Sequence, residues 1–168
     1  MPYTDLLRAS VFLTAGEATV LGAIAAIAIA DDPTTATLAI AAAWWIAALA
    51  IGIYLGRPAR AAEALRDPLA EARTATSLPS ETPIWIALAR LWPIGASAIA
   101  AGVLGIFFPG VAIIGAGYAL LVSLAWHSHE AAVLAIEQRD GVKFYVVPNS
   151  GLRPVELIRT PGLRSSVS

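Results

Sequence analysis

The sequence predicts an all-α integral membrane protein: a four-transmembrane-helix bundle with a small cytoplasmic C-terminal β-hairpin. Three observations lead to this fold class. Hydrophobic residues make up 58% of the 168 residues and charged residues only 14%, well below the roughly 25% that soluble domains carry. Four apolar stretches are long enough to cross a bilayer, which takes about 20 helical residues. Basic residues gather in alternate connections between these stretches, the pattern of a multi-pass membrane protein.

The four predicted spans cover residues 8–30, 35–56, 84–108 and 110–137, and the last is expected to leave the bilayer after residue 126 as a continuing helix. Each must be helical, because a backbone in lipid has to satisfy its own hydrogen bonds. Pro33 in DDPTT ends the first span, and the following threonines can cap the second. FFPG at 107–110 predicts a tight turn. Residues 1–137 thus form a transmembrane domain, and residues 138–168 a cytoplasmic tail.

The basic residues predict the orientation of the chain. The 57–82 loop carries four arginines and the C-terminal segment five basic residues, whereas the other two connections carry none. The positive-inside rule therefore places both termini and the central loop in the cytoplasm. We expect the membrane to be the inner membrane of a bacterium. AIA at 28–30 resembles a signal-peptidase site, so cleavage after residue 30 stays an alternative. The long apolar region and its carboxylate Glu17 favour a retained first span.

The soluble segments are short. The central loop has apolar residues at Ala61, Leu65 and Leu69 between charges of both signs, which predicts an amphipathic helix at the membrane interface, interrupted at Pro68. In the tail, two β-favouring runs flank PNSG at 148–151, a hairpin signal. An isolated hairpin is marginal in water. We therefore expect it to pack on the central loop, on a neighbouring subunit or on a partner protein.

Small residues predict where the helices pack. Gly52 and Gly56 form a G-x-x-x-G motif on the second span, and Gly102 lies one turn after Ala98 on the third. Small side chains one turn apart allow another helix backbone to approach closely. Trp44 and Trp45 are expected to fill volume beside such residues. The small-residue repeat on the first span, Ala18, Gly22, Ala26 and Ala30, is explained by the alanine-rich composition alone.

Four ionisable residues in the spans form a predicted polar cluster: Glu17, Arg90, His127 and Glu130. Helix rise places Glu17 about 15 Å and Arg90 about 9 Å from the cytoplasmic side. Residues 127 and 130 are three apart, which puts them on one helix face. Ionised groups in lipid usually pair, so we expect an ion pair between Glu17 and Arg90. Pro93 removes a helical hydrogen bond and predicts a kink beside it.

This cluster has four interpretations. It can be a structural ion pair that fixes which helices meet, or a proton or ion relay in which Glu17 or His127 titrates. It can also be a metal site or a catalytic site. The chain has no cysteine, no G-x-S-x-G, no H-E-x-x-H and no Walker loop. We therefore predict no enzyme activity, no cofactor and no bound metal, and the net charge of −1 argues against a nucleic-acid partner.

The predicted function is that of a non-enzymatic inner-membrane protein, an assembly or accessory subunit. It would associate through small-residue helix faces and its hairpin, as a homo-oligomer or within a larger membrane complex. The alternative is a small proton- or ion-coupled transporter or channel that uses Glu17, Arg90, His127 and Glu130.

Overall fold

The computed structural model describes residues 1–31, 34–74, 82–148 and 152–161. These ranges contain six helices and three short strands. In chain order they are α1 (Tyr3–Asp31), α2 (Thr35–Leu55), α3 (Pro58–Ala70), β1 (Arg73–Thr74), α4 (Pro83–Phe107), α5 (Pro109–Trp126), α6 (His129–Asp140), β2 (Val142–Val146) and β3 (Leu157–Pro161).

Four helical segments are long and apolar enough to cross a membrane: α1, α2, α4 and the segment Pro109–Asp140. Their bounds agree with the predicted spans to within a few residues, and Thr34 caps α2 through its side chain. The fourth segment differs from the prediction of an unbroken helix, because a turn at His127 and Ser128 separates α5 from α6. There the His127 Nδ1 contacts the carbonyl of Leu124, and its Nε2 lies 3.1 Å from the Ser128 hydroxyl.

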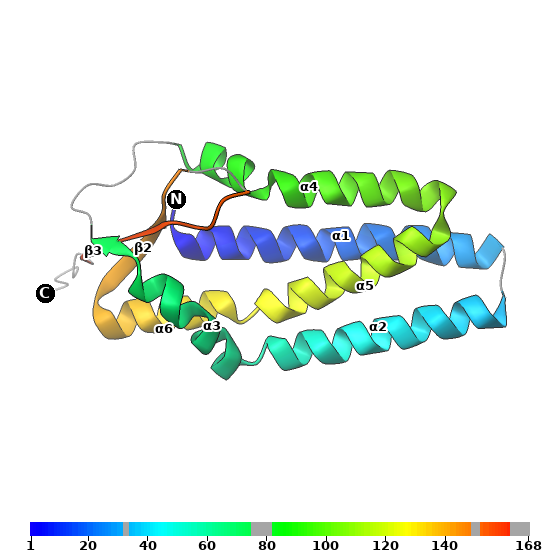
Figure 1. Ribbon diagram of the computed structural model, residues 1–168, viewed down its shortest axis with the longest axis horizontal. Coiled ribbons are helices and arrows are strands. Elements are labelled where there is room, and N and C mark those ends of the chain that lie inside the picture. Colours follow the sequence, from blue (N-terminus) through cyan, green and yellow to red (C-terminus); the bar gives the residue numbers. More distant parts are fainter. Residues whose placement is uncertain (32–33, 75–81, 149–151, 162–168) are drawn as a thin grey trace, which may run out of the picture.

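The long helices lie side by side, and α3, α6 and the strands gather at one end of them (Figure 1). Helix α5 packs against α1, α2 and α4, whereas α1 and α2 have little direct contact. The buried positions of α5 are nearly all small, namely Ala112, Ile113, Ala116, Gly117, Ala119, Ser123 and Ala125. Small side chains let neighbouring backbones approach on more than one side, which places α5 at the centre.

Gly52 and Gly56 both lie against α5. A Cβ atom added to Gly52 would sit 2.9 Å from the Leu124 Cβ and 3.0 Å from the Leu121 carbonyl oxygen, and one added to Gly56 would meet the Leu124 carbonyl and the His127 ring. Gly102, in contrast, has no heavy atom within 4 Å of such a Cβ. The packing role predicted for Gly102 is therefore not seen in the described chain.

The two central tryptophans of α2 also bind α5. The indole N–H of Trp45 donates to the carbonyl of Ile113 at 2.9 Å, and that of Trp44 donates to the carbonyl of Ile114 at 3.2 Å. The Trp44 ring lies where a side chain at Gly117 would be. As expected, Trp44 fills space beside a small residue, and the indole N–H groups of both tryptophans find partners within the protein.

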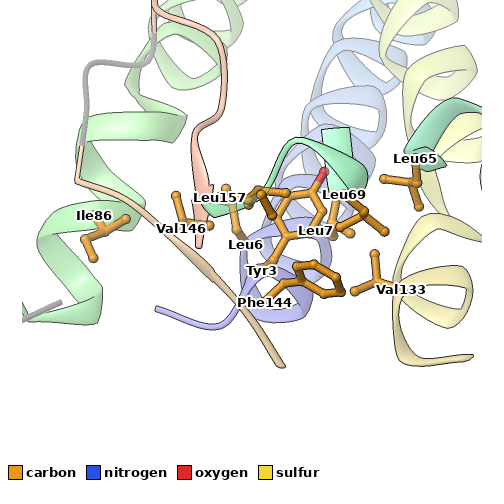
Figure 2. Close-up of a cluster of buried hydrophobic side chains, with 11 residues drawn as sticks. Tyr3, Leu6, Leu7, Leu65, Leu69, Ile86, Val133, Phe144, Val146 and Leu157 are labelled. Atoms are coloured by element: carbon orange, nitrogen blue, oxygen red, sulfur yellow. The ribbon is translucent and has the colours of Figure 1, made fainter. Parts of the chain in front are cut away.

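We call the assembly of α3, α6, the strands and the first turns of α1 and α4 the cap. Its buried apolar side chains come from α1, α3, α4, α6, β2 and β3, together with Ala72 just before β1, as Figure 2 shows for the residues around Phe144. They are Tyr3, Leu6, Leu7, Leu65, Leu69, Ala72, Ile86, Val133, Phe144, Val146 and Leu157. The tail strands therefore share one core with the helices before residue 137 and do not form a core of their own.

The predicted hairpin forms as β2 and β3, but it belongs to a mixed three-stranded sheet. β3 is central and pairs antiparallel with β2, and in parallel with β1 from the central loop. Of the three supports expected for the hairpin, the central loop is thus the one observed. Residues 149–151 of the predicted turn lie outside the described residues.

The outer edge of β2 is closed by other parts of the chain. The amide of Val146 donates to the Met1 carbonyl at 3.0 Å, and the amide of Phe144 donates to a Glu137 carboxylate oxygen at 2.9 Å. Burial lowers the pKa of the Met1 amino group, and the Asp5 carboxylate opposes this shift. Closed edges prevent further strands from pairing, so β2 offers no free edge at these two amides.

The predicted interruption of helix α3 at Pro68 is wrong. The helix continues through this proline to Ala70, and Ala61, Leu65 and Leu69 are buried. Leu65 and Leu69 flank Pro68 and insert into the cap core, which holds the helix together although proline removes one backbone hydrogen bond. The apolar face of α3 therefore packs on protein.

The close contact at Gly52 yields a stability prediction. We expect Gly52→Ala to lower the free energy of unfolding by about 1–3 kcal/mol, because the added methyl group overpacks a contact that includes backbone atoms. The measurement is equilibrium unfolding of the purified protein in mixed micelles. Gly102→Ala is the matched control, since open space surrounds Gly102. Equal stability of the two variants would contradict the close α2–α5 contact.

Candidate functional site

Arg90 on α4 holds the C-terminal segment in place. Only 7% of this residue is exposed, and its guanidinium donates to the carbonyls of Arg153 at 2.7 Å and Pro154 at 3.0 Å. The carboxylate of Glu156 adds a favourable electrostatic interaction. In Figure 1 the red segment before β3 reaches the start of α4. Arg90 thus binds the segment that precedes β3 to the first part of α4.

The predicted ion pair between Glu17 and Arg90 is wrong. The tail folds back along α4 and supplies carbonyl oxygens to Arg90, which therefore does not need a carboxylate from α1. Glu17 is half-buried on α1, and across the described ranges its side chain makes no hydrogen bond or ion pair.

Pro93 lies inside α4, whose helical structure runs unbroken to Phe107.

His127 and Glu130 do not share a helix face either, because the turn after Trp126 separates them. Glu130, in the first turn of α6, forms an ion pair with Arg8 of α1. The Arg8 Nε lies 3.2 Å from each Glu130 oxygen. Arg8 was not predicted as a partner of Glu130. The available signal was its position at the start of the first span, at the same end of the bundle where the last span ends near Glu130.

The predicted polar cluster is therefore divided into separate contacts. Arg90 and Glu130 each join a helix to another part of the cap, His127 lies in the turn beside Gly56, and Glu17 stands apart. Within residues 1–31, 34–74, 82–148 and 152–161, no three histidine, aspartate or glutamate side chains come close enough to hold a metal ion. The ionisable residues of the spans do not converge on one chemical centre.

A second feature is an apolar groove of about 330 Å³ between α1, α2 and α5. It exists because α1 and α2 both pack on α5 but barely on each other. Its α1 wall is made of small residues, and α5 forms much of the rest. The lining consists of Ala15, Ala18, Thr19, Gly22, Trp45, Ala116, Leu120, Ser123 and Leu124.

The chemistry of this groove suits apolar contact. No ionisable side chain lines it. The Thr19 hydroxyl donates to the Ala15 carbonyl at 2.9 Å, and the Ser123 hydroxyl lies 3.5 Å from the Val11 carbonyl. The repeat of small residues that includes Ala18 and Gly22 was attributed to the alanine-rich composition alone. Both residues line this groove. The lining offers apolar contact and no charged group that would polarise a substrate.

Comparison of the chain with protein-family models, with curated proteins and with solved structures yields no match.

The Arg90 contacts yield a prediction about the cap. We expect Arg90→Met to raise amide hydrogen exchange in β3 by about tenfold or more, because hydrogen bonds from a charged donor contribute about 1.5–3 kcal/mol each. Exchange measured by mass spectrometry on the full chain checks this. Arg153→Ala is the control, since it removes a side chain but keeps the carbonyl that Arg90 binds. Unchanged exchange in Arg90→Met would show that the tail is held by other contacts.

Proposed function

We propose that this protein is a non-enzymatic, multi-pass component of the bacterial inner membrane that associates laterally with another transmembrane helix. The observation that carries the proposal is the groove between α1, α2 and α5. The helix that fills it belongs to a second copy of the chain or to a subunit of a larger membrane complex.

The groove supports helix association for a physical reason. Lipid tails are as apolar as leucine, so helices in a bilayer associate through close van der Waals contact at small residues. Ala15, Ala18 and Gly22 line the groove from α1, and an added Cβ at Gly22 would meet no heavy atom within 4 Å. An incoming helix can therefore approach the α1 backbone closely.

The proposed orientation places the cap and both termini in the cytoplasm. Basic residues are abundant in the loop and tail segments that build the cap, whereas Asp31 marks the opposite end of α1. The positive-inside rule favours the basic end in the cytoplasm. The cap would then face soluble partners, while the groove faces the bilayer.

A second candidate function, proton- or ion-coupled transport, is favoured by Glu17. An unpartnered carboxyl inside a span is costly to ionise and often marks a proton or ion path. The other three residues of the predicted cluster do not join Glu17 in the described chain. Any such pathway would therefore depend on Glu17 alone among them.

Cysteine cross-linking tests the proposed association, since the chain has no cysteine of its own. We expect Ala18→Cys to form a cross-linked species in cell membranes, whose mass identifies a second copy or a different protein. Adding Gly22→Leu should abolish it by filling the groove. Gly16→Leu is the matched control, because Gly16 is equally open but does not line the groove. A cross-link that survives Gly22→Leu, or no cross-link at all, would refute the proposal.

Proteoliposome flux tests the second candidate. If Glu17 carries protons, Glu17→Gln abolishes pH-dependent flux and leaves the fold intact, because the structure gives the carboxylate no ion pair to lose. If the protein only assembles, the wild type and Glu17→Gln give the same background signal. Circular dichroism on both proteins checks that the variant is folded.

A further inference from the structure

Two arginines lie on one tyrosine where α2 ends and α3 begins. The guanidinium carbon of Arg60 is 4.3 Å from the centre of the Tyr54 ring, and that of Arg57 is 5.0 Å from it. Arg60 also donates a hydrogen bond to the Tyr54 hydroxyl at 2.7 Å. Cations over an aromatic face are attracted by its electron density. The Tyr54 ring therefore holds both guanidinium groups close to each other.

The backbone fixes this arrangement. Gly56 ends α2, and its backbone lies so close to the Leu124 carbonyl and the His127 ring that a side chain would not fit. Arg57 follows in extended conformation as the N-cap of α3, and Pro58 opens that helix. The change of direction between the two helices therefore takes place within two residues, which brings Arg57 and Arg60 back over Tyr54.

Neither guanidinium is neutralised within the described part of the chain. No carboxylate lies within 4.0 Å of Arg57 or Arg60 there, and both residues are exposed. Glu63, the next acidic residue on α3, makes no ion pair. Two adjacent positive charges without a counter-ion raise the local affinity for an anion.

The position of the pair indicates which anion. Helix α2 is apolar, with a mean hydropathy of 2.1 in its most apolar window, and Tyr54 is its second-last residue. Tyrosine at the end of a span lies at headgroup level, where phosphate groups of lipids are concentrated. The fork of a guanidinium matches phosphate oxygens in pairs.

We propose that Tyr54, Arg57 and Arg60 bind the phosphate of an anionic phospholipid headgroup on the cytoplasmic side. This inference rests on the membrane orientation proposed above but not on the groove or on Glu17. The tyrosine holds the two guanidinium groups, which bind the phosphate oxygens, while the acyl chains of the lipid lie along the exposed apolar surface of α2.

Native mass spectrometry of the full-length protein, titrated in detergent with phosphatidylglycerol or phosphatidylcholine, tests the site. We expect selective retention of phosphatidylglycerol, weakened about thirtyfold in Arg57→Gln/Arg60→Gln, because each basic residue near an anionic surface contributes about 1 kcal/mol. Arg66→Gln/Arg73→Gln removes the same charge from exposed positions of the cap and should bind like the wild type. Tyr54→Phe keeps the ring and should lose only part of the affinity.

Three results would overturn the inference. Unchanged phosphatidylglycerol binding in Arg57→Gln/Arg60→Gln would exclude the site, and equal losses in the Arg66/Arg73 control would show a general charge effect. Inorganic phosphate that displaces the lipid at millimolar concentration would identify a site for soluble anions. Lipid binding is measured in detergent, and its residues differ from those of the groove. A negative result in the groove cross-linking experiment therefore does not affect the lipid-binding result, and a negative lipid-binding result does not affect the cross-linking experiment.

Discussion

Close approach to α5 is the constraint on which the rest of the structure depends. In lipid no hydrophobic force drives helices together, so contact depends on how near two backbones can come. The buried side chains of α5 are small, and the facing positions of α2 are Gly52, Gly56 and the two tryptophans that hydrogen-bond to α5 carbonyls. Because α1 and α2 both pack against α5, they remain apart from each other. The groove follows from this arrangement.

At the other end of the molecule, charged groups connect the helices to the cap. Two nitrogens of the buried Arg90 guanidinium donate to tail carbonyls, and Arg8 binds Glu130 between α1 and α6. Burial of a charge is tolerated when hydrogen bonds replace the lost water. Here both charges lie near helix ends, close to the cap, and they join segments that are far apart in the sequence. The apolar core around Phe144 lies in the same cap and joins residues of α1, α3, α4, α6, β2 and β3.

The helical segments were predictable because length and hydropathy alone identify them, and the hairpin because its β-favouring runs flank a turn motif. The partners of the polar residues were not predictable from the sequence. Helix rise gives the depth of Glu17 and Arg90 but not the direction in which each side chain points, and it does not reveal that the tail returns to α4. The His127 turn, the continuity of α3 through Pro68 and the open surroundings of Gly102 likewise depend on tertiary neighbours.

The strand order of the sheet has a consequence for biosynthesis. β1 comes from the central loop, yet its partner in the described sheet is β3, and Arg73 pairs with Ile158. The central strand is therefore the last of the three to leave the ribosome, after every long helix has been made. Until then Tyr3, Leu6 and Leu7 lack part of the core that covers them. A nascent chain that stops short of β3 leaves part of this apolar core uncovered, the kind of surface that chaperones and quality-control proteases recognise.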